Sequence, residues 1–360
     1  MIPLFWPQIY KDEWLLELSE IFETRWLGQG PKVNEFENEF GKKFNYNYCL
    51  AVNSGSAALE LAYHLIGISE GDEVLTTVFT CTATNLPLLR RKAKLVFVDI
   101  SQNDLLIDYE DLKKKVTNKT KAIVVVTLGG LPIDKRIFEL AESKNIPVVI
   151  DAAQSVGISE QYGDYICYSF QAIKHFTSAD GGMLVVRDEE IYNKAKKLRW
   201  FGIDREAKKR AGWKCIVNHQ MAMDIEEAGF KFHMNDLTAT MGLVGLRHSD
   251  EILVQRQKIV LKYLNQLNTQ VIAGGACWLV AILVNNPDDV SAVCKNSGIE
   301  TDLVQLRNDI FSVFGGKRQN LPNMNYLEDK YLYLPINCKV SLDDTDYICE
   351  VVNSCSSSMR

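Results

Sequence analysis

The chain has 360 residues, of which 47% are hydrophobic, 24% charged and 10% aromatic, as is ordinary for a folded globular protein. Its formal net charge is −6, whereas proteins that bind nucleic acid or an anionic membrane surface usually carry an excess of positive charge. No apolar run approaches the roughly 18 residues that span a bilayer, and the N-terminal residues lack the basic and apolar regions of a signal peptide. We therefore expect no nucleic-acid partner and no membrane association.

The nine cysteines are scattered along the chain without a C-x-x-C pair, and the five histidines form no metal-binding spacing. An odd, unclustered set of cysteines in a chain of this length is typical of reduced thiols. The sequence therefore predicts a cytoplasmic protein with no disulfide framework and no metal site.

Helical and strand-like patterns alternate from the start of the chain. Apolar residues at helical spacing predict helices over 12–26 and 33–43, separated by a break rich in Gly and Pro. A short buried strand over 48–52 then leads through small residues into an amphipathic helix.

That small-residue turn predicts a phosphate-binding cup. A strand followed by a tight turn and a helix presents backbone N–H groups at the helix N-terminus. Gly55 allows close approach of the backbone, and Ser56 adds a hydroxyl. The alternative is a plain helix cap by Ser54 or Ser56.

The alternation continues to about residue 200 and predicts a doubly wound, mainly parallel sheet with right-handed crossovers. The run 121–130 is continuously apolar, as in strands buried on both faces of a parallel sheet. Other strands are predicted at 71–77, 94–100, 146–151, 165–170 and 183–188, and helices at 79–93, 108–117, 133–144 and 189–200.

A second, smaller domain is expected after a long helical pattern over 236–267 that is bent or split around 242–249. Residues 202–228 look irregular and predict a long loop or lid. We place the large domain at 1–248 and the small domain at 249–360. Within the small domain we predict strands at 277–284 and 331–337 and helices at 288–298 and 342–354.

The residues best suited to catalysis and cofactor binding lie between positions 151 and 182. Asp151 and Ser169 end two successive predicted strands, where open α/β sheets bind ligands, and Lys174 follows among small and apolar residues. A lysine can form a Schiff base with an aldehyde cofactor, an acid can hold a pyridinium nitrogen, and a serine can hold a phosphate. Together they predict a pyridoxal phosphate site. Taken singly, Asp151 could cap a helix that begins at Ala152, and Lys174 could simply be solvated.

Several motifs, in this order and spacing, resemble the DegT/DnrJ/EryC1/StrS family of pyridoxal-phosphate-dependent nucleotide-sugar aminotransferases, which have fold type I. The resemblance covers nearly the whole chain and implies an α/β fold with a mainly parallel sheet in the large domain and a smaller α+β C-terminal domain. The motifs are NSGSAAL (53–59), GDEVLTT (71–77), FVDI (97–100), DAAQS (151–155), SFQAIKHFTSADGG (169–182) and GFKFHMNDLTATMG (229–242).

The resemblance implies roles for individual residues. Lys174 would hold the cofactor as a Schiff base and, once freed, act as general base, while Asp151 would pair with the ring nitrogen. Gln154 would contact the ring hydroxyl region. The phosphate would be held by Ser56, the backbone of Gly55 and Ala57, and Ser169.

The same resemblance implies a homodimer with a shared active site. Lys231, His233 and Asn235 occupy positions where relatives reach the cofactor phosphate of the neighbouring subunit.

Three positions compared with the family pattern bear on function. Where relatives stack an aromatic on the cofactor ring, this chain has Cys81, so either the thiol packs the ring or Phe79 compensates. Sugar 3-dehydratases of the group carry histidine at the Schiff-base position, whereas this chain carries Lys174 with His175 after it. The segment 304–314 contains Arg307, a candidate for the substrate's diphosphate or a surface salt bridge.

These features predict an aminotransferase that moves an amino group from L-glutamate to a nucleotide-linked 4-keto-6-deoxyhexose, giving a 4-amino-4,6-dideoxysugar. The alternatives are a sugar 3-dehydratase or another eliminase, a cyclitol or 3-keto-sugar aminotransferase, or a non-catalytic regulator with the same fold. Lys174 and Asp151 together weigh against the regulator, since a scaffold needs neither.

Overall fold

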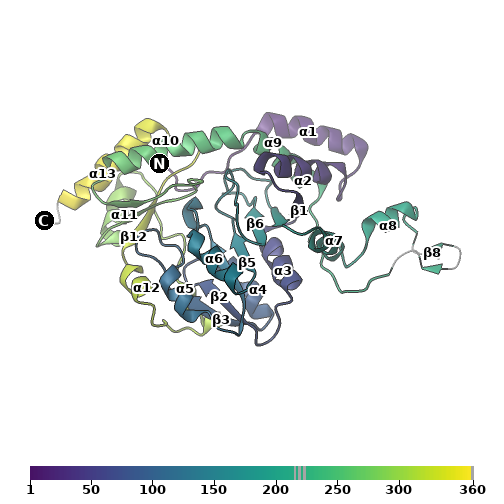
Figure 1. Ribbon diagram of the computed structural model, residues 1–360. Helices are drawn as coiled ribbons and strands as arrows, with labels where there is room; N and C mark the ends of the chain where they lie inside the picture. The colour runs from purple at the N-terminus through teal and green to yellow at the C-terminus, as the bar shows by residue number, and fades with distance from the viewer. Residues whose placement is uncertain (215, 218–219, 222–223, 358–360) are drawn as a thin grey trace.

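The computed structural model describes residues 1–214, 216–217, 220–221 and 224–357. A seven-stranded sheet with helices packed on both faces makes up the larger part, and a three-stranded sheet with its own helices makes up the smaller part (Figure 1). The mainly parallel α/β architecture that we predicted is therefore confirmed. Among the described residues, no helix is both long enough and apolar enough to cross a membrane.

The large sheet has the strand order β1-β7-β6-β5-β4-β2-β3. β7 pairs antiparallel with β1 and with β6, and the remaining pairs are parallel. The strands are β1 (Tyr48–Val52), β2 (Glu73–Thr77), β3 (Lys94–Val98), β4 (Thr120–Val126), β5 (Val148–Asp151), β6 (Tyr165–Ser169) and β7 (Gly182–Val186).

Alternate residues of the strands pack into two hydrophobic cores, one on each face of this sheet. On one face Ile123 and Ile150 pack with Phe36 of α2, and on the other face Val124 packs with Leu61 of α3. Burial on both faces explains why β4 and β5 are continuously apolar. The helices of this part are α1 (Lys11–Thr24), α2 (Pro31–Phe44), α3 (Gly55–Ile66), α4 (Thr82–Arg90), α5 (Tyr109–Lys115), α6 (Lys135–Ser143), α7 (Glu189–Leu198) and α9 (Asp236–Arg247).

The smaller part is built on the antiparallel sheet β10-β11-β12. It contains a strand that we did not predict, β10, and its β11 begins three residues later than predicted. The elements are α10 (Ser249–Gln266), β10 (Gln270–Ile272), β11 (Val280–Leu283), α11 (Pro287–Asn296), α12 (Pro322–Leu327), β12 (Tyr331–Leu334) and α13 (Leu342–Ser357).

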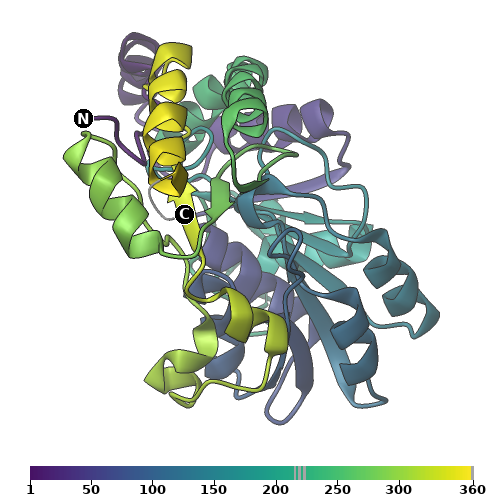
Figure 2. The same ribbon diagram turned by 90° about the vertical axis from the view of Figure 1, so that its left-hand side faces the viewer.

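The predicted domain boundary at 248/249 falls where α9 ends and α10 begins, and the division itself stays a prediction. The first residues of the chain nevertheless lie against the smaller part. The N–H of Ile2 donates to the carbonyl of Gly298 (2.7 Å), and the side chain of Asn337 donates to the carbonyl of Pro3 (2.7 Å). Figure 2 views the molecule from the side on which this smaller part lies.

The segment 202–228 is more regular than the long loop that we predicted. It contains the short helix α8 (Arg205–Arg210) and the hairpin strands β8 (Ile216–Val217) and β9 (Gln220–Met221). Figure 1 shows α8 and β8 standing away from the sheet and its helices. Residues 215, 218–219 and 222–223 lie outside the described residues.

Candidate active site

The predicted site residues converge on one edge of the large sheet. Because β1, β2, β4, β5 and β6 run in the same direction, their carboxyl ends lie at the same edge. That edge receives Ser54 and Gly55 after β1, Asp151 at the end of β5 and Ser169 at the end of β6. It is the edge at which open α/β sheets bind ligands.

Lys174 lies in the turn that follows β6 and is partly buried. Burial lowers the pKa of the Lys174 amine to about 8, while the neighbouring Asp151 and Cys81 act in the opposite direction. An amine with this pKa is partly unprotonated near neutral pH, as a nucleophile toward an aldehyde must be.

Asp151 is buried, and two groups donate hydrogen bonds to its carboxylate. These are the hydroxyl of Thr84 (2.7 Å) and the N–H of Ala153 (3.1 Å). Burial raises the pKa of Asp151, and the two hydrogen bonds and Lys174 oppose that shift. No helix begins after Asp151, so the alternative role as a helix cap is wrong. A buried carboxylate of this kind can keep a weakly basic ring nitrogen protonated.

The N-terminus of α3 has the features of the predicted phosphate cup. Ser54 caps the helix, because its hydroxyl accepts a hydrogen bond from the N–H of Ala57 (3.1 Å). This contact engages the Ala57 amide that we had assigned to the phosphate. It leaves Ser56, which is exposed at the helix start, with its hydroxyl available for a ligand.

Gly55 brings this helix end close to Ser169. A Cβ on Gly55 would stand 2.8 Å from the Cβ of Ser169 and 3.3 Å from its hydroxyl oxygen, so any side chain would collide there. The packing therefore requires glycine and places the Ser169 hydroxyl beside the start of α3.

Gln154 is buried and is held by the turn η1 (Leu128–Gly130) that follows β4. The N–H of Gly129 donates to the amide oxygen of Gln154 (2.6 Å). With the oxygen engaged, the group left to bind a ring hydroxyl is the amide NH₂.

The structure distinguishes the two candidates for packing the cofactor ring. Phe79 is fully buried in a core cluster and lies edge-on to Tyr331, with ring centroids 5.0 Å apart. Cys81 is exposed, precedes α4 and lies close enough to Lys174 to affect its pKa. The Phe79 ring is therefore enclosed in the core, and packing of the cofactor ring by the Cys81 thiol stays a prediction.

His233 lies beside β1, to which it is joined by an antiparallel bridge at Val52. Burial and the cations of Lys231, Arg205 and Arg199 lower the pKa of His233 to about 4. A concentration of positive charge next to a neutral imidazole suits an anion. Asn235 uses its side-chain oxygen to cap α9 by accepting from the N–H of Thr238 (2.9 Å).

Arg307 lies in an environment that neither predicted role, a diphosphate ligand or a surface salt bridge, would lead one to expect. It belongs to residues 304–328, which we call the strap because hydrogen bonds fasten them to the large sheet's helices and turns. The Arg307 guanidinium is buried, with 2% of the side chain exposed, so it is no surface salt bridge. It donates to Asp309 (2.7 Å twice), Glu328 (2.8 Å), Asn325 (2.6 Å) and the Gln319 carbonyl (3.2 Å).

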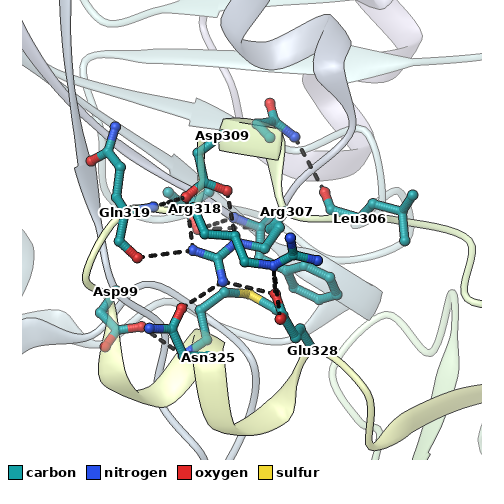
Figure 3. Close-up of polar contacts among 12 residues, drawn as sticks. Asp99, Leu306, Arg307, Asp309, Arg318, Gln319, Asn325 and Glu328 are labelled. Atoms are coloured by element: carbon teal, nitrogen blue, oxygen red, sulfur yellow. Dashed lines mark hydrogen bonds and ion pairs between the residues drawn. The ribbon is translucent and has the colours of Figure 1, made fainter. Parts of the chain in front are cut away.

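Figure 3 shows Arg307 enclosed by these acceptors. A guanidinium has five N–H donors, and these contacts engage all five. Binding a diphosphate would require Arg307 to break this network. The contacts show that Arg307 supports the strap from within, and its role toward the substrate stays a prediction.

Four further hydrogen bonds hold the strap in place. The side chain of Asn308 donates to the carbonyl of Thr80 (2.7 Å) and accepts from the side chain of Asn85 (2.9 Å). The carboxylate of Asp99 accepts from the N–H groups of Asn323 (2.8 Å) and Met324 (2.9 Å) at the start of α12. The strap therefore lies against the turn that carries Cys81.

These residues fit pyridoxal phosphate group by group. Its aldehyde can be met by the Lys174 amine, its ring nitrogen by the buried Asp151 carboxylate and its ring hydroxyl by the Gln154 amide. Its phosphate can be met by the α3 N-terminus and Ser169.

Sequence reasoning missed three residues of the site. Thr84 binds Asp151, Gly129 holds Gln154, and the ring centroid of Trp278 lies 4.0 Å from the Lys174 ammonium nitrogen. Thr84 lies in a predicted helix, and Gly129 and Trp278 lie in predicted strands. None carries a local sequence signal, because each contact joins distant parts of the chain.

Comparison with known proteins agrees with this geometry. The model of the DegT/DnrJ/EryC1/StrS aminotransferase family matches residues 8–353. The spore coat polysaccharide biosynthesis protein SpsC of Bacillus subtilis is 32% identical, with 98% of this chain and 96% of SpsC covered. GDP-perosamine synthase of Escherichia coli O157:H7 is 28% identical, with 98% of each chain covered.

Among solved structures, the putative sugar aminotransferase Spr1654 of Streptococcus pneumoniae in its PMP form superposes with a TM-score of 0.91 at 25% identity, and all of both chains is covered. The same protein has been solved in a PLP form, with a TM-score of 0.90. The chain therefore belongs to the DegT/DnrJ/EryC1/StrS aminotransferase family and is a sugar aminotransferase that uses pyridoxal phosphate.

Proposed function

We propose that this enzyme transfers the amino group of L-glutamate to the keto carbon of a nucleotide-linked 4-keto-6-deoxyhexose, forming a 4-amino-4,6-dideoxysugar. Support for the substrate class comes from the similarity to GDP-perosamine synthase, which extends over 98% of each chain. The observation that carries the reaction type is the pair formed by Lys174, whose pKa burial lowers to about 8, and the buried Asp151.

Each side chain has a definite task in this reaction. When bound, the cofactor supplies an electron sink. The Asp151 carboxylate holds a proton on the ring nitrogen, and the Lys174 amine takes and returns the proton at the reacting carbon. Asp151 is isolated from solvent, which strengthens its interaction with a positive ring. Lys174 at the Schiff-base position favours amino transfer over dehydration.

We also propose a homodimer in which the residues around His233 contribute to the partner's phosphate site. His233 is partly buried, and its Nδ1 has no hydrogen-bond partner among the described residues. Lys231 and Arg205 add positive charge beside it. An anion supplied by a second subunit would satisfy this charge. The scattered cysteines of the sequence support a cytoplasmic location.

The test is the visible absorption spectrum of purified protein, with and without L-glutamate, for the native sequence, Lys174→Ala and Lys144→Ala. Native protein should show the yellow band of covalently bound pyridoxal phosphate, and glutamate should bleach it. Lys174→Ala should lack the band, and Lys144→Ala, altered at an exposed lysine, should behave like the native protein.

Addition of a candidate nucleotide keto-sugar to the bleached protein should restore the yellow band. UDP-, GDP- and dTDP-linked 4-keto-6-deoxyhexoses are compared, with a 3-keto sugar as the contrasting substrate. A band that glutamate leaves unchanged would overturn the proposed donor. Recovery with the 3-keto sugar alone would overturn the proposed position of amination.

A further inference from the structure

The site contains an aromatic ring for which the reaction described above gives no role. The Trp278 indole is buried, and the Lys174 ammonium nitrogen stands over it, 4.0 Å from the ring centroid. A cation over an indole face is attracted by the ring's electron density, and the attraction is largest where water is excluded. Trp278 precedes β11, 104 positions along the chain from Lys174.

The same indole also fastens the backbone next to the lysine. Its Nε1–H donates to the carbonyl of Ile173, directly before Lys174 (3.2 Å). On the other side of the lysine, the imidazole of His175 contacts the carbonyl of Ala276 (2.6 Å). A carbonyl can only accept, so His175 Nε2 donates. Both neighbours of Lys174 are therefore tied to residues 276–278.

Residues 276–278 are themselves held firmly. The N–H of Trp278 donates to the carbonyl of Gly129 (2.9 Å), in the turn whose N–H binds Gln154. The buried guanidinium of Arg256 donates to the carbonyls of Cys277 and Trp278 (3.2 Å each). One short segment thus links the lysine turn to the turn that holds Gln154.

We propose that Trp278 is a positioning residue for Lys174, and that its indole face is where the lysine ammonium rests whenever the amine is not joined to the cofactor. The inference rests on the assignment of Lys174 as the cofactor lysine. During amino transfer the lysine leaves the cofactor and must hold a proton close to the reacting carbon. An aromatic face can stabilise that ammonium without forming a hydrogen bond that would have to break on each turnover.

Three titratable groups face Lys174 besides the ring. Asp151 and Cys81 favour the protonated amine, and His175, which burial and Arg256 keep neutral by lowering its pKa, adds no positive charge. Removal of the indole face should therefore make the ammonium less stable and lower the pH at which Lys174 becomes reactive.

The test measures Lys174 in cofactor-free protein by its labelling with acetic anhydride over a pH series, followed by peptide mass spectrometry. The native midpoint should lie at about 8. Trp278→Leu, which loses both the ring and its N–H, should lower that midpoint by about one pH unit. Trp278→Phe keeps an aromatic face but loses the N–H, so its midpoint should fall by less than half as much.

Trp6→Leu is the matched control, because it removes an exposed indole that faces a different lysine, Lys339, at 4.2 Å. Its Lys174 midpoint should equal the native one. Equal midpoints in native protein and Trp278→Leu, or equal shifts in the Leu and Phe variants, would overturn the proposal.

If circular dichroism shows that Trp278→Leu does not fold, native protein containing ring-fluorinated tryptophan replaces it. Fluorine withdraws electron density from the indole face with little change of shape, so the Lys174 midpoint should fall, and an unchanged midpoint would overturn the proposal. Because labelling needs no cofactor, its outcome is separate from the yellow band. Absence of that band in the native protein would contradict the assignment of Lys174 itself.

Discussion

The sheet edge and the strap both carry buried charges, but they satisfy them in opposite ways. On the sheet edge, the Asp151 carboxylate accepts two hydrogen bonds and forms no ion pair with any described residue, and burial raises its pKa. In the strap, the Arg307 guanidinium engages all its donors within the same segment.

The different environments of Asp151 and Arg307 indicate which of the two buried charges is available for a ligand. A buried charge without a counter-ion is costly and persists where a bound group completes it. A buried charge whose partners are all internal fixes a conformation and gains little from a ligand. By this criterion we expect the sheet edge to hold the cofactor and Arg307 to support the strap rather than contact a ligand.

The first and largest test of this comparison removes the charge of Asp151. Asp151→Asn keeps the size of the side chain but cannot hold a proton on the cofactor ring. We expect the rate of bleaching by L-glutamate, measured by stopped-flow absorption, to fall on the order of a thousandfold. Asp134→Asn, altered at a carboxylate paired with Arg136, should leave the rate unchanged. A normal rate in Asp151→Asn would contradict the idea that the buried charge on the sheet edge serves the cofactor.

The second test breaks the strap network. Arg307→Ala leaves Asp309 buried without its cation, so the free energy of unfolding should fall by about 3–5 kcal/mol. Arg318→Ala is the matched control, since Arg318 binds Glu328 of the same network but is mostly exposed, and it should cost at most about 1 kcal/mol. Urea unfolding measures both.

Arg307→Lys distinguishes support of the strap from binding of the substrate. Lysine keeps the positive charge but cannot supply five donors in a plane. If Arg307 only supports the strap, this variant should lose stability while the KM for the nucleotide sugar stays within about threefold of the native value. A KM that rises more than tenfold with stability intact would return Arg307 to the substrate site.

The two regions also differ in what the sequence could predict. Asp151, Ser169 and Lys174 follow strands whose apolar runs are obvious, so both their positions and their meeting at one edge follow from the parallel topology. The family resemblance added the roles. The cap at α3 could not be chosen from sequence, because Ser54 and Ser56 are both good caps, and only the contact with Ala57 selects Ser54.

The strap and the lysine support were beyond prediction for a physical reason. Arg307 meets Glu328, and Trp278 meets Lys174, through contacts that no local pattern in the sequence predicts. Whether Phe79 or Cys81 faces the cofactor depends on the path of the backbone after β2, which turns Phe79 toward Tyr331. Such choices are set by tertiary packing and leave no periodic trace.

The third and smallest test concerns Thr84, which supports Asp151 from the first turn of helix α4. Its hydroxyl donates to Asp151 and lowers the carboxyl pKa, while burial raises it. A carboxyl whose folded-state pKa is raised costs stability as the pH rises above its unfolded value, because the folded state then retains more protons. Thr84→Val removes the opposing hydrogen bond, so this cost should grow.

We expect cofactor-free Thr84→Val to lose about 1.5–3 kcal/mol of unfolding free energy at pH 8, the usual contribution of a hydrogen bond to a charged group. At pH 5 the loss should be smaller, because more of the Asp151 carboxyl is then protonated and needs the donor less. Thr117→Val, altered at an exposed threonine bond to Glu73, is the control and should show no such pH dependence. An equal loss at both pH values would mean that Thr84 supports the start of α4 and not the charge of Asp151.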